Sequence, residues 1–138
     1  MGIKLVFKNA DFSENGIAPE YMEIPVSADW EGWLCNYNGG TTAQQNASWS
    51  TAFFAIPEGA TAVYLSGYVD SEDRFGVSLV SDYNTTNHTY TNVAINLEAS
   101  SASALAREEL DLSSYPTAKY VMWCRIGSTG VPTVEVLE

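Results

Sequence analysis

Alternation of apolar and polar residues with a period of two recurs along this chain and restricts its fold more than any other feature. In the segment 90–97 the odd positions hold Thr, Val, Ile and Leu, and the even positions hold Tyr, Asn, Ala and Asn. Successive side chains of a β-strand point to opposite faces of the sheet, so this pattern predicts a strand with one apolar face. Similar alternation covers 4–8, 74–82 and 119–126, which predicts a chain made mainly of strands.

Turn signals separate the predicted strands. Pro57 and Gly59 lie between the apolar segment 49–56 and the segment 62–68, so these two segments are expected to form a hairpin or a corner between sheets. Pro25 interrupts the alternation around it, which places that segment at a sheet edge or at the end of a strand.

One stretch departs from the alternation. Residues 101–110 hold a serine followed by alanine, leucine, arginine and glutamate, which favour one or two helical turns, with an ordered loop as the alternative. About eight strands with at most one short helix predict an all-β fold, an antiparallel β-sandwich of jelly-roll type. No linker or repeat divides residues 1–138, so a single domain is expected.

Composition and net charge argue against some classes of binding partner. The chain of 138 residues is 46% hydrophobic and carries 6 Lys and Arg against 17 Asp and Glu, for a net charge of −11. Six scattered cations cannot form a basic stripe, which argues against nucleic acid and against an anionic membrane surface as partners. No apolar run approaches the ~18 residues of a membrane span, so membrane insertion is not expected. The first residues alternate and then turn polar at Asn9, which predicts no signal peptide.

The residues that usually carry catalysis are scarce. The single histidine, His88, lies in a polar segment expected to be a solvated turn. The acidic runs at 70–73 and 108–111 are expected to be solvated charge, and no phosphate loop or nucleophile motif is present. Cys35 and Cys124 are expected to be buried, reduced thiols, with a disulfide between them as the alternative. The chain is therefore expected not to be an enzyme.

The predicted binding site consists of aromatic rings and planar polar groups on the solvent faces of strands. In 119–126 the core face is assigned to the even positions, which leaves Trp123 and Arg125 on the solvent face. A tryptophan offers a flat apolar plate to the C–H face of a sugar, and an arginine offers fixed donors to hydroxyls. The alternative is that a loop covers Trp123 as a core residue. The predicted ligand-binding residues are Trp123, Arg125, Tyr90, Asn92, Asn96, Tyr64, Tyr68, Arg74 and Trp30.

Trp30 belongs to a second candidate region, the segment 28–40, which holds two tryptophans, a tyrosine and several small polar residues. This segment is a candidate binding loop, because loops on a rigid scaffold often carry binding residues. The alternative is that Trp33 covers the end of the core while Trp30 packs against the sheet edge.

Calcium is the most reasonable ion for an acidic β-protein, because it takes oxygen ligands from loops. Asn9, Asp11, Glu135 and Glu138 approach one another if the first and last strands pair. A structural calcium held by Asn9, Asp11 and Glu135 is therefore the predicted cofactor.

Short motifs across most of the chain resemble one family. The segment 9–13, Asn-Ala-Asp-Phe-Ser, resembles the "NGDFE"-type opening of galactose-binding-like carbohydrate-binding modules, although Ser13 stands where an acidic residue is commoner. The closing strand at 133–138 is similar to the end of such domains. The segments 56–64 and 112–121 resemble β-sandwich domains of phage tail and adhesion proteins and of bacterial surface glycan-handling proteins. The resemblance implies a jelly roll, a non-catalytic role directed at glycans, and calcium near the first and last strands.

Three functions follow as expectations. The leading one is a carbohydrate-binding module that recognises a glycan or polysaccharide, in a phage tail or cell-surface assembly located on a virion or an extracellular surface. The alternative is a structural module that forms a homo-oligomer or larger assembly through the same aromatic face, without a small ligand. An accessory domain of an enzyme encoded by a flanking segment is the third.

Overall fold

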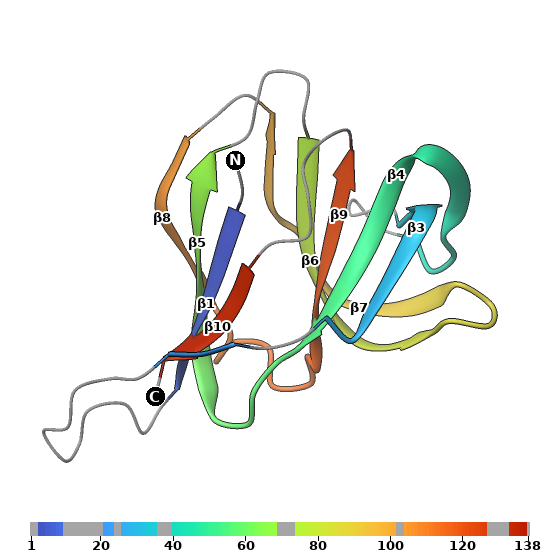
Figure 1. Cartoon of the computed structure of the whole chain (residues 1–138). Coiled ribbons are helices and arrows are strands. Elements are labelled where there is room, and N and C mark those ends of the chain that lie inside the picture. The colour runs from blue at the N-terminus through green and yellow to red at the C-terminus, as the bar shows by residue number, and fades with distance from the viewer. Residues whose placement is uncertain are drawn as a thin grey trace, which may run out of the picture.

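The computed structural model describes residues 3–9, 21–23, 26–35, 40–68, 74–101, 104–126 and 133–137, with side-chain surroundings for 26–35, 40–63, 75–95 and 110–126. Ten strands account for most of these residues (Figure 1). Their bounds are β1 Ile3–Asn9, β2 Tyr21–Glu23, β3 Ala28–Leu34, β4 Gln44–Ala55, β5 Ala60–Tyr68, β6 Arg74–Asn84, β7 Thr89–Ser101, β8 Ala104–Asp111, β9 Tyr120–Ile126 and β10 Thr133–Leu137.

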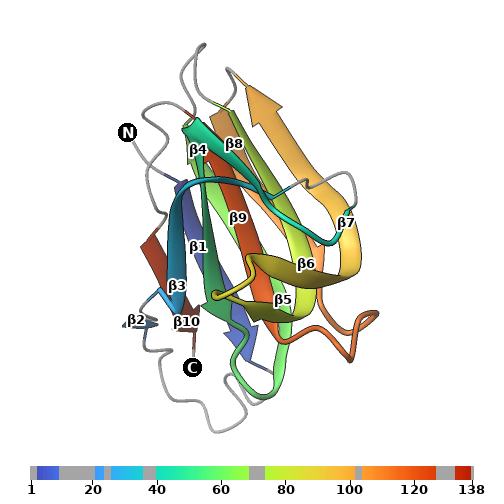
Figure 2. The same cartoon turned by 90° about the vertical axis from the view of Figure 1, so that its right-hand side faces the viewer.

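The strands form two five-stranded sheets. Sheet A has the order β2-β10-β1-β5-β8, and sheet B has the order β3-β4-β9-β6-β7. Neighbouring strands are antiparallel except β1 and β10, which are parallel. Figures 1 and 2 show the sheets packed face to face. The prediction of an all-β sandwich is confirmed, and β2 lies at a sheet edge as Pro25 indicated.

The link from β4 to β5 carries the chain from one sheet to the other. Backbone N–H of Ala60 donates to the carbonyl of Pro57 across 3.1 Å, and Gly59 has a φ of 83° that side chains rarely tolerate. Of the two predicted arrangements, hairpin or corner, the corner is the one observed, because β4 belongs to sheet B and β5 to sheet A.

The helical turns expected within 101–110 are not present. Residues 104–111 form β8, which pairs with β5 so that Leu110 lies opposite Val63 and Asp111 opposite Ala62. Helix propensity differs by only a few tenths of a kcal/mol among these residues, and the ladder that β8 forms with β5 outweighs it. Among the described residues, no helix has the length and apolar character that a transmembrane span requires.

The candidate binding loop is a strand over most of its length. Residues 28–34 form β3, which pairs with β4 and contains a bulge between Glu31 and Trp33. Gly32 occupies this bulge with a φ of 79°, and its backbone N–H donates to Ser50 Oγ across 3.2 Å. Positions 36–39 of the candidate loop lie outside the described residues.

Sheet B is covered on both faces. Its inner face contributes Trp123, Phe54 and Phe75 to a core shared with sheet A, which we call the inner cluster. Its outer face carries a second buried group, which we call the outer cluster and which consists of Trp30, Cys35, Ala43, Phe53, Val80, Tyr90 and Met122.

The tip of the β6–β7 hairpin closes the outer cluster. Figure 2 shows this hairpin crossing in front of β4 and β9. Backbone N–H of Ala43 donates to the carbonyl of His88 across 2.8 Å, and Trp30 Nε1 donates to Thr85 Oγ1 across 3.2 Å. His88, which was expected to be a solvated turn residue, is half-buried with its ring stacked on Trp33 at 3.7 Å. The hairpin tip is therefore fastened to β3 and to the segment before β4.

Candidate functional site

Trp123 does not lie on a solvent face. It is fully buried, and its ring stacks on Phe75 with a centroid separation of 4.5 Å and an angle of 15° between the planes. The prediction of Trp123 as an exposed sugar platform is wrong, and the alternative of a core position holds. The reason is its position in β9, the middle strand of sheet B, where the inner and outer clusters cover both faces.

Arg125 also lies in a buried position, on the same face of β9 as Trp123. Its guanidinium donates twice to the carboxylate of Asp29 on β3, from Nη1 to Oδ1 and from Nη2 to Oδ2, each across 3.0 Å. The side chain of Arg125 is 10% exposed and that of Asp29 is 23% exposed. This two-point ion pair occupies the donors that the sequence analysis assigned to a ligand.

The other predicted sheet-face residues are dispersed or buried. Tyr90 and Trp30 belong to the outer cluster and are 2% and 4% exposed, so neither presents a ring to solvent. Asn92 is half-buried, and its Nδ2 donates to the carbonyl of Gly40. The expectation of solvent-facing positions is therefore wrong for Tyr90 and Trp30, because the β6–β7 hairpin covers the face on which they lie.

Strand order also divides the predicted set between the two sheets. Tyr64 and Tyr68 lie in β5 of sheet A, whereas Arg74 and Asn96 lie in β6 and β7 of sheet B. The single platform that these residues were expected to share is therefore not formed. The side chains of these four residues lie outside the described residues.

The predicted calcium ligands gain one element of support from the backbone. β1 and β10 pair, as the prediction required. In this ladder Glu135 lies opposite Val6, which precedes Asn9 by three residues in β1. The side chains of Asn9 and Glu135 and the whole of Asp11 lie outside the described residues, so the calcium site stays a prediction. Within the described part of the chain, no group of three or more His, Cys, Asp or Glu side chains is placed to hold a metal ion.

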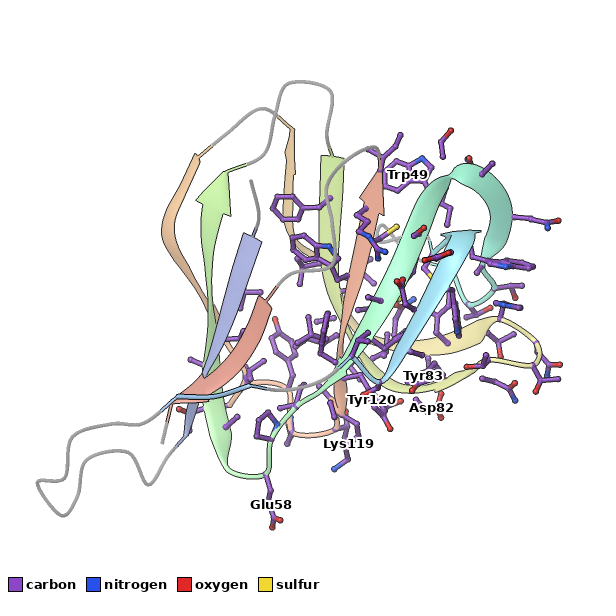
Figure 3. All side chains as sticks on the ribbon, viewed as in Figure 1. Trp49, Glu58, Asp82, Tyr83, Lys119 and Tyr120 are labelled. Carbon is purple, nitrogen blue, oxygen red and sulfur yellow. The ribbon has the colours of Figure 1, made fainter. Side chains whose placement is uncertain are left out.

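A pocket of about 410 Å³ lies at one end of the sandwich, between the β4–β5 corner and the β8–β9 connection. We call it the corner pocket. Its rim carries the exposed side chains of Glu58 and Lys119, which Figure 3 shows extending from this end of the molecule. The residues that line it are Ile56, Pro57, Glu58, Gly59, Ala60, Leu112, Tyr115, Pro116, Ala118 and Lys119.

The wall of the corner pocket continues the inner cluster. Ile56, Ala60, Tyr115 and Ala118 are partly buried and pack against that cluster, and Leu112 belongs to it. Tyr115 is half-buried, so part of its ring contacts the core while the rest lines the pocket. The pocket therefore rests on packed apolar residues, but its accessible lining is more polar than apolar, and its two charged groups lie at the rim.

Backbone hydrogen bonds fix the two connections that form the pocket. Backbone N–H of Ile56 donates to the carbonyl of Lys119 across 2.8 Å, and N–H of Leu112 donates to the carbonyl of Thr61 across 2.9 Å. In turn, N–H of Lys119 donates to the carbonyl of Val80 across 2.9 Å. These bonds join β4, β5 and β6 to the β8–β9 connection, so the pocket is largely formed before any ligand binds.

Asp111 holds the start of the β8–β9 connection. Its Oδ1 accepts from the backbone N–H of Ser113 at 2.9 Å and from Ser113 Oγ at 2.6 Å, and its Oδ2 accepts from Ser114 Oγ at 2.8 Å. The hydroxyl of Ser113, then that of Ser114 and the Ser113 backbone, lower the pKa of the Asp111 carboxyl.

Asp111→Asn is expected to lower the stability of the protein at neutral pH, because an amide cannot accept these three hydrogen bonds with a full negative charge. A lowered pKa in the folded state means that the stabilisation is complete above the ordinary carboxyl value of 3.8 and is lost as the pH falls below it, through the lowered pKa. Urea unfolding of both proteins at pH 7, and at steps below pH 4, checks this.

The matched control for this prediction is Glu31→Gln, which removes an exposed carboxylate from β3. The difference between wild type and Asp111→Asn should shrink with falling pH, whereas the control should show little difference at any pH. A loss of stability in Asp111→Asn that stays the same down to the lowest pH would contradict a role for the charge.

A pair of tyrosines packs against the outer cluster, on the other face of sheet B from the corner pocket. Tyr120 follows Lys119 in the chain, lies beside Val80 in the β6–β9 ladder, and contacts Tyr83 edge to face with centroids 4.9 Å apart. Both tyrosines are half-buried, and Figure 3 shows them grouped with Asp82 and Lys119. Burial, followed by the neighbouring Tyr120, raises the pKa of the Tyr83 hydroxyl.

The sequence contained partial signals for this site. The connections at 57–59 and 112–118 carry proline beside glycine or tyrosine, which marks turns, but nothing in the sequence indicates that the two turns meet. Tyr120 was assigned to a core face and Tyr83 was not selected.

Comparison of the chain with protein-family models, with curated proteins and with solved structures yields no match.

Proposed function

We propose that the chain is a non-catalytic carbohydrate-binding β-sandwich module, and that the sugar binds in the corner pocket. The observation that carries this proposal is the composition of the pocket, which combines apolar ring surface with two opposite charges at the rim. A sugar ring has an apolar C–H face and a perimeter of hydroxyls. Tyr115 offers a surface for the C–H face, while Glu58 accepts hydrogen bonds from hydroxyls and Lys119 donates them.

The size and construction of the pocket fit a small part of a glycan. Its volume of about 410 Å³ is near the lower end of the range for ligand sites, about 300–1,000 Å³. Within the pocket, the half-buried ring of Tyr115 is the aromatic surface, and Glu58 and Lys119 flank it at the rim. A chain end or a short branch of a polysaccharide matches this arrangement.

The route of the chain supports the finer part of the proposal. From β4 to β10 the strands lie in sheets B, A, B, B, A, B and A, an alternation typical of jelly rolls. This agrees with the resemblance to galactose-binding-like modules. In the proposal the module belongs to a phage tail or cell-surface assembly, and a structural calcium held by Asn9, Asp11 and Glu135 stabilises the paired β1 and β10.

A glycan array, probed with the purified chain in calcium and again with a chelator, is the first test. Reproducible binding to a related group of sugars supports the proposal. Loss of that binding in chelator supports the calcium site as well. A blank array from a folded sample overturns the proposal, and a stable oligomer in light scattering would then favour the assembly role.

Substitutions in the rim and wall locate the site once a sugar is known. Glu58→Gln removes an exposed carboxylate without touching the core, and it is expected to weaken binding about fivefold or more, as loss of a charge-assisted hydrogen bond does. Tyr115→Ala is expected to weaken binding by about 1 kcal/mol or more through loss of the aromatic surface. Isothermal titration calorimetry measures both.

Trp33→Ala is the control for these substitutions. Trp33 is a half-buried ring like Tyr115, but it lies beside His88 and away from the corner pocket. Its removal should leave sugar affinity unchanged. If Trp33→Ala abolishes binding while Glu58→Gln and Tyr115→Ala do not, the sugar binds on the outer face of sheet B and the corner pocket is excluded.

A further inference from the structure

Two thiols that the proposed sugar site does not use converge on one residue of sheet B. Cys35 directly follows β3, and Cys124 lies in β9; both are fully buried and both are free thiols. Thr51 of β4 lies directly opposite Cys124 in the β4–β9 ladder. Backbone N–H of Cys35 donates to Thr51 Oγ1 across 3.3 Å. The chain after β3 therefore passes over Thr51, beside the strand that carries Cys124.

Both cysteines lie on the outer side of sheet B. Cys35 and Met122 belong to the outer cluster, and Cys124 lies two residues after Met122 in β9, on the same face of that strand. The Thr51 hydroxyl, which accepts from the backbone N–H of Cys35, donates to the carbonyl of Trp33 across 3.1 Å and so holds the end of β3 over this face. Cys124 is also near enough to be one of the causes that raise the pKa of Cys35.

We propose that Cys35 and Cys124 form a disulfide bond when the protein folds in an oxidising medium, and that this bond fastens the end of β3 to the central strand β9. The structure represents the reduced form of this pair. The oxidant is a low-molecular-weight disulfide. One cysteine thiolate attacks it and releases one thiolate, and the second cysteine then attacks the mixed disulfide and releases the other. Two S–H bonds and the reagent's S–S bond break, one protein S–S bond forms, and the reagent gains both electrons and both protons as two thiols.

Burial makes the folded, reduced pair slow to react. Desolvation is the main cause that raises the pKa of Cys35 to about 12 and that of Cys124 to about 11. Thiolate is the reacting form, so few molecules react at neutral pH while the outer cluster is closed. Oxidation is therefore expected during folding, when the two residues meet before the outer cluster excludes the reagent. Once formed, the bond is protected from reductants by the same burial.

The disulfide closes a loop of about 90 residues, which restricts the unfolded chain strongly. Protein refolded from urea in a mixture of oxidised and reduced glutathione is expected to have a mass about 2 Da lower than the reduced chain. After denaturation it should show no thiols to Ellman's reagent. Its Tm should be about 10 °C higher than that of the same protein treated with dithiothreitol under denaturing conditions and refolded in reductant.

Single substitutions test the pairing. Cys35→Ser and Cys124→Ser should each retain one free thiol after the same refolding, and the Tm of each should be independent of the reductant. The comparison of oxidised with reduced wild type needs no variant, so it holds even if a serine disturbs folding. Folded wild type that keeps two titratable thiols after oxidative refolding overturns the proposal, as does oxidation that yields only disulfide-linked dimers.

Discussion

Replacing Trp123 by alanine is expected to destabilise the protein by about 3–5 kcal/mol, the usual cost of removing a large aromatic side chain from a packed core. Trp123 is fully buried and stacks on Phe75, and its neighbours in the inner cluster come from both sheets. The cavity left by the indole cannot close easily, because sheet B is held from its outer face by a second packed layer. Urea unfolding followed by circular dichroism measures the loss.

Two further substitutions test whether the loss of stability in Trp123→Ala comes from the buried volume of the indole. Trp123→Phe keeps most of the apolar volume and removes the indole Nε1, which is buried without a hydrogen-bond partner among the described residues. It is therefore expected to cost only about 1 kcal/mol. Trp33→Ala, which removes a half-buried indole, should also cost less than Trp123→Ala. A loss below about 1 kcal/mol in Trp123→Ala would mean that the ring does not fill the core.

Removing the Arg125 guanidinium is expected to cost about 3 kcal/mol, near the lower end of the range for breaking a buried ion pair. Arg125→Ala leaves the Asp29 carboxylate in a position where its side chain is only 23% exposed, without its two donors. The cost arises mainly from that uncompensated charge. The double variant Asp29→Ala/Arg125→Ala removes the charge as well, so it should be more stable than Arg125→Ala alone.

A double-mutant cycle separates these contributions. The free energies of unfolding of wild type, Asp29→Ala, Arg125→Ala and the double variant give the coupling between the two side chains, which should be about 1–3 kcal/mol. If the loss of stability in the double variant equals the sum of the losses in the two single variants, the side chains are not coupled and the pairing is contradicted. Glu31→Gln is a suitable control, because Glu31 lies on the same strand as Asp29 but is exposed.

The fold could be predicted from local patterns because most strands carry their own signal. Alternation marked the positions of β1, β6, β7 and β9, and the prolines marked an edge and a corner. Strand β8 was not predicted, because its alanine, leucine and glutamate residues favour a helix. Only pairing with β5 makes the extended form more stable.

The candidate site could not be predicted, because its position depends on which strands are central. Alternation was used to divide β9 into a core face and a solvent face. However, the run Val-Met-Trp-Cys at 121–124 is apolar at every position, which is the pattern of a strand buried on both faces. The corner pocket depends on a contact between the turns at 57–59 and 112–118, which are separated in the sequence by the four strands β5 to β8. Such a contact exists only once the sheets are assembled.

The parallel pairing of β1 with β10 has a consequence for the order in which the two sheets form. All five strands of sheet B lie within residues 28–126, so sheet B forms without the ends of the described chain. Sheet A is completed only when β10 inserts between β1 and β2, which joins Lys4 to Thr133 across almost the whole sequence. Contacts of such long range form slowly, and until they form the edge of β1 is open to other chains. Late docking of β10 therefore ends the interval in which a folding molecule is most exposed to aggregation.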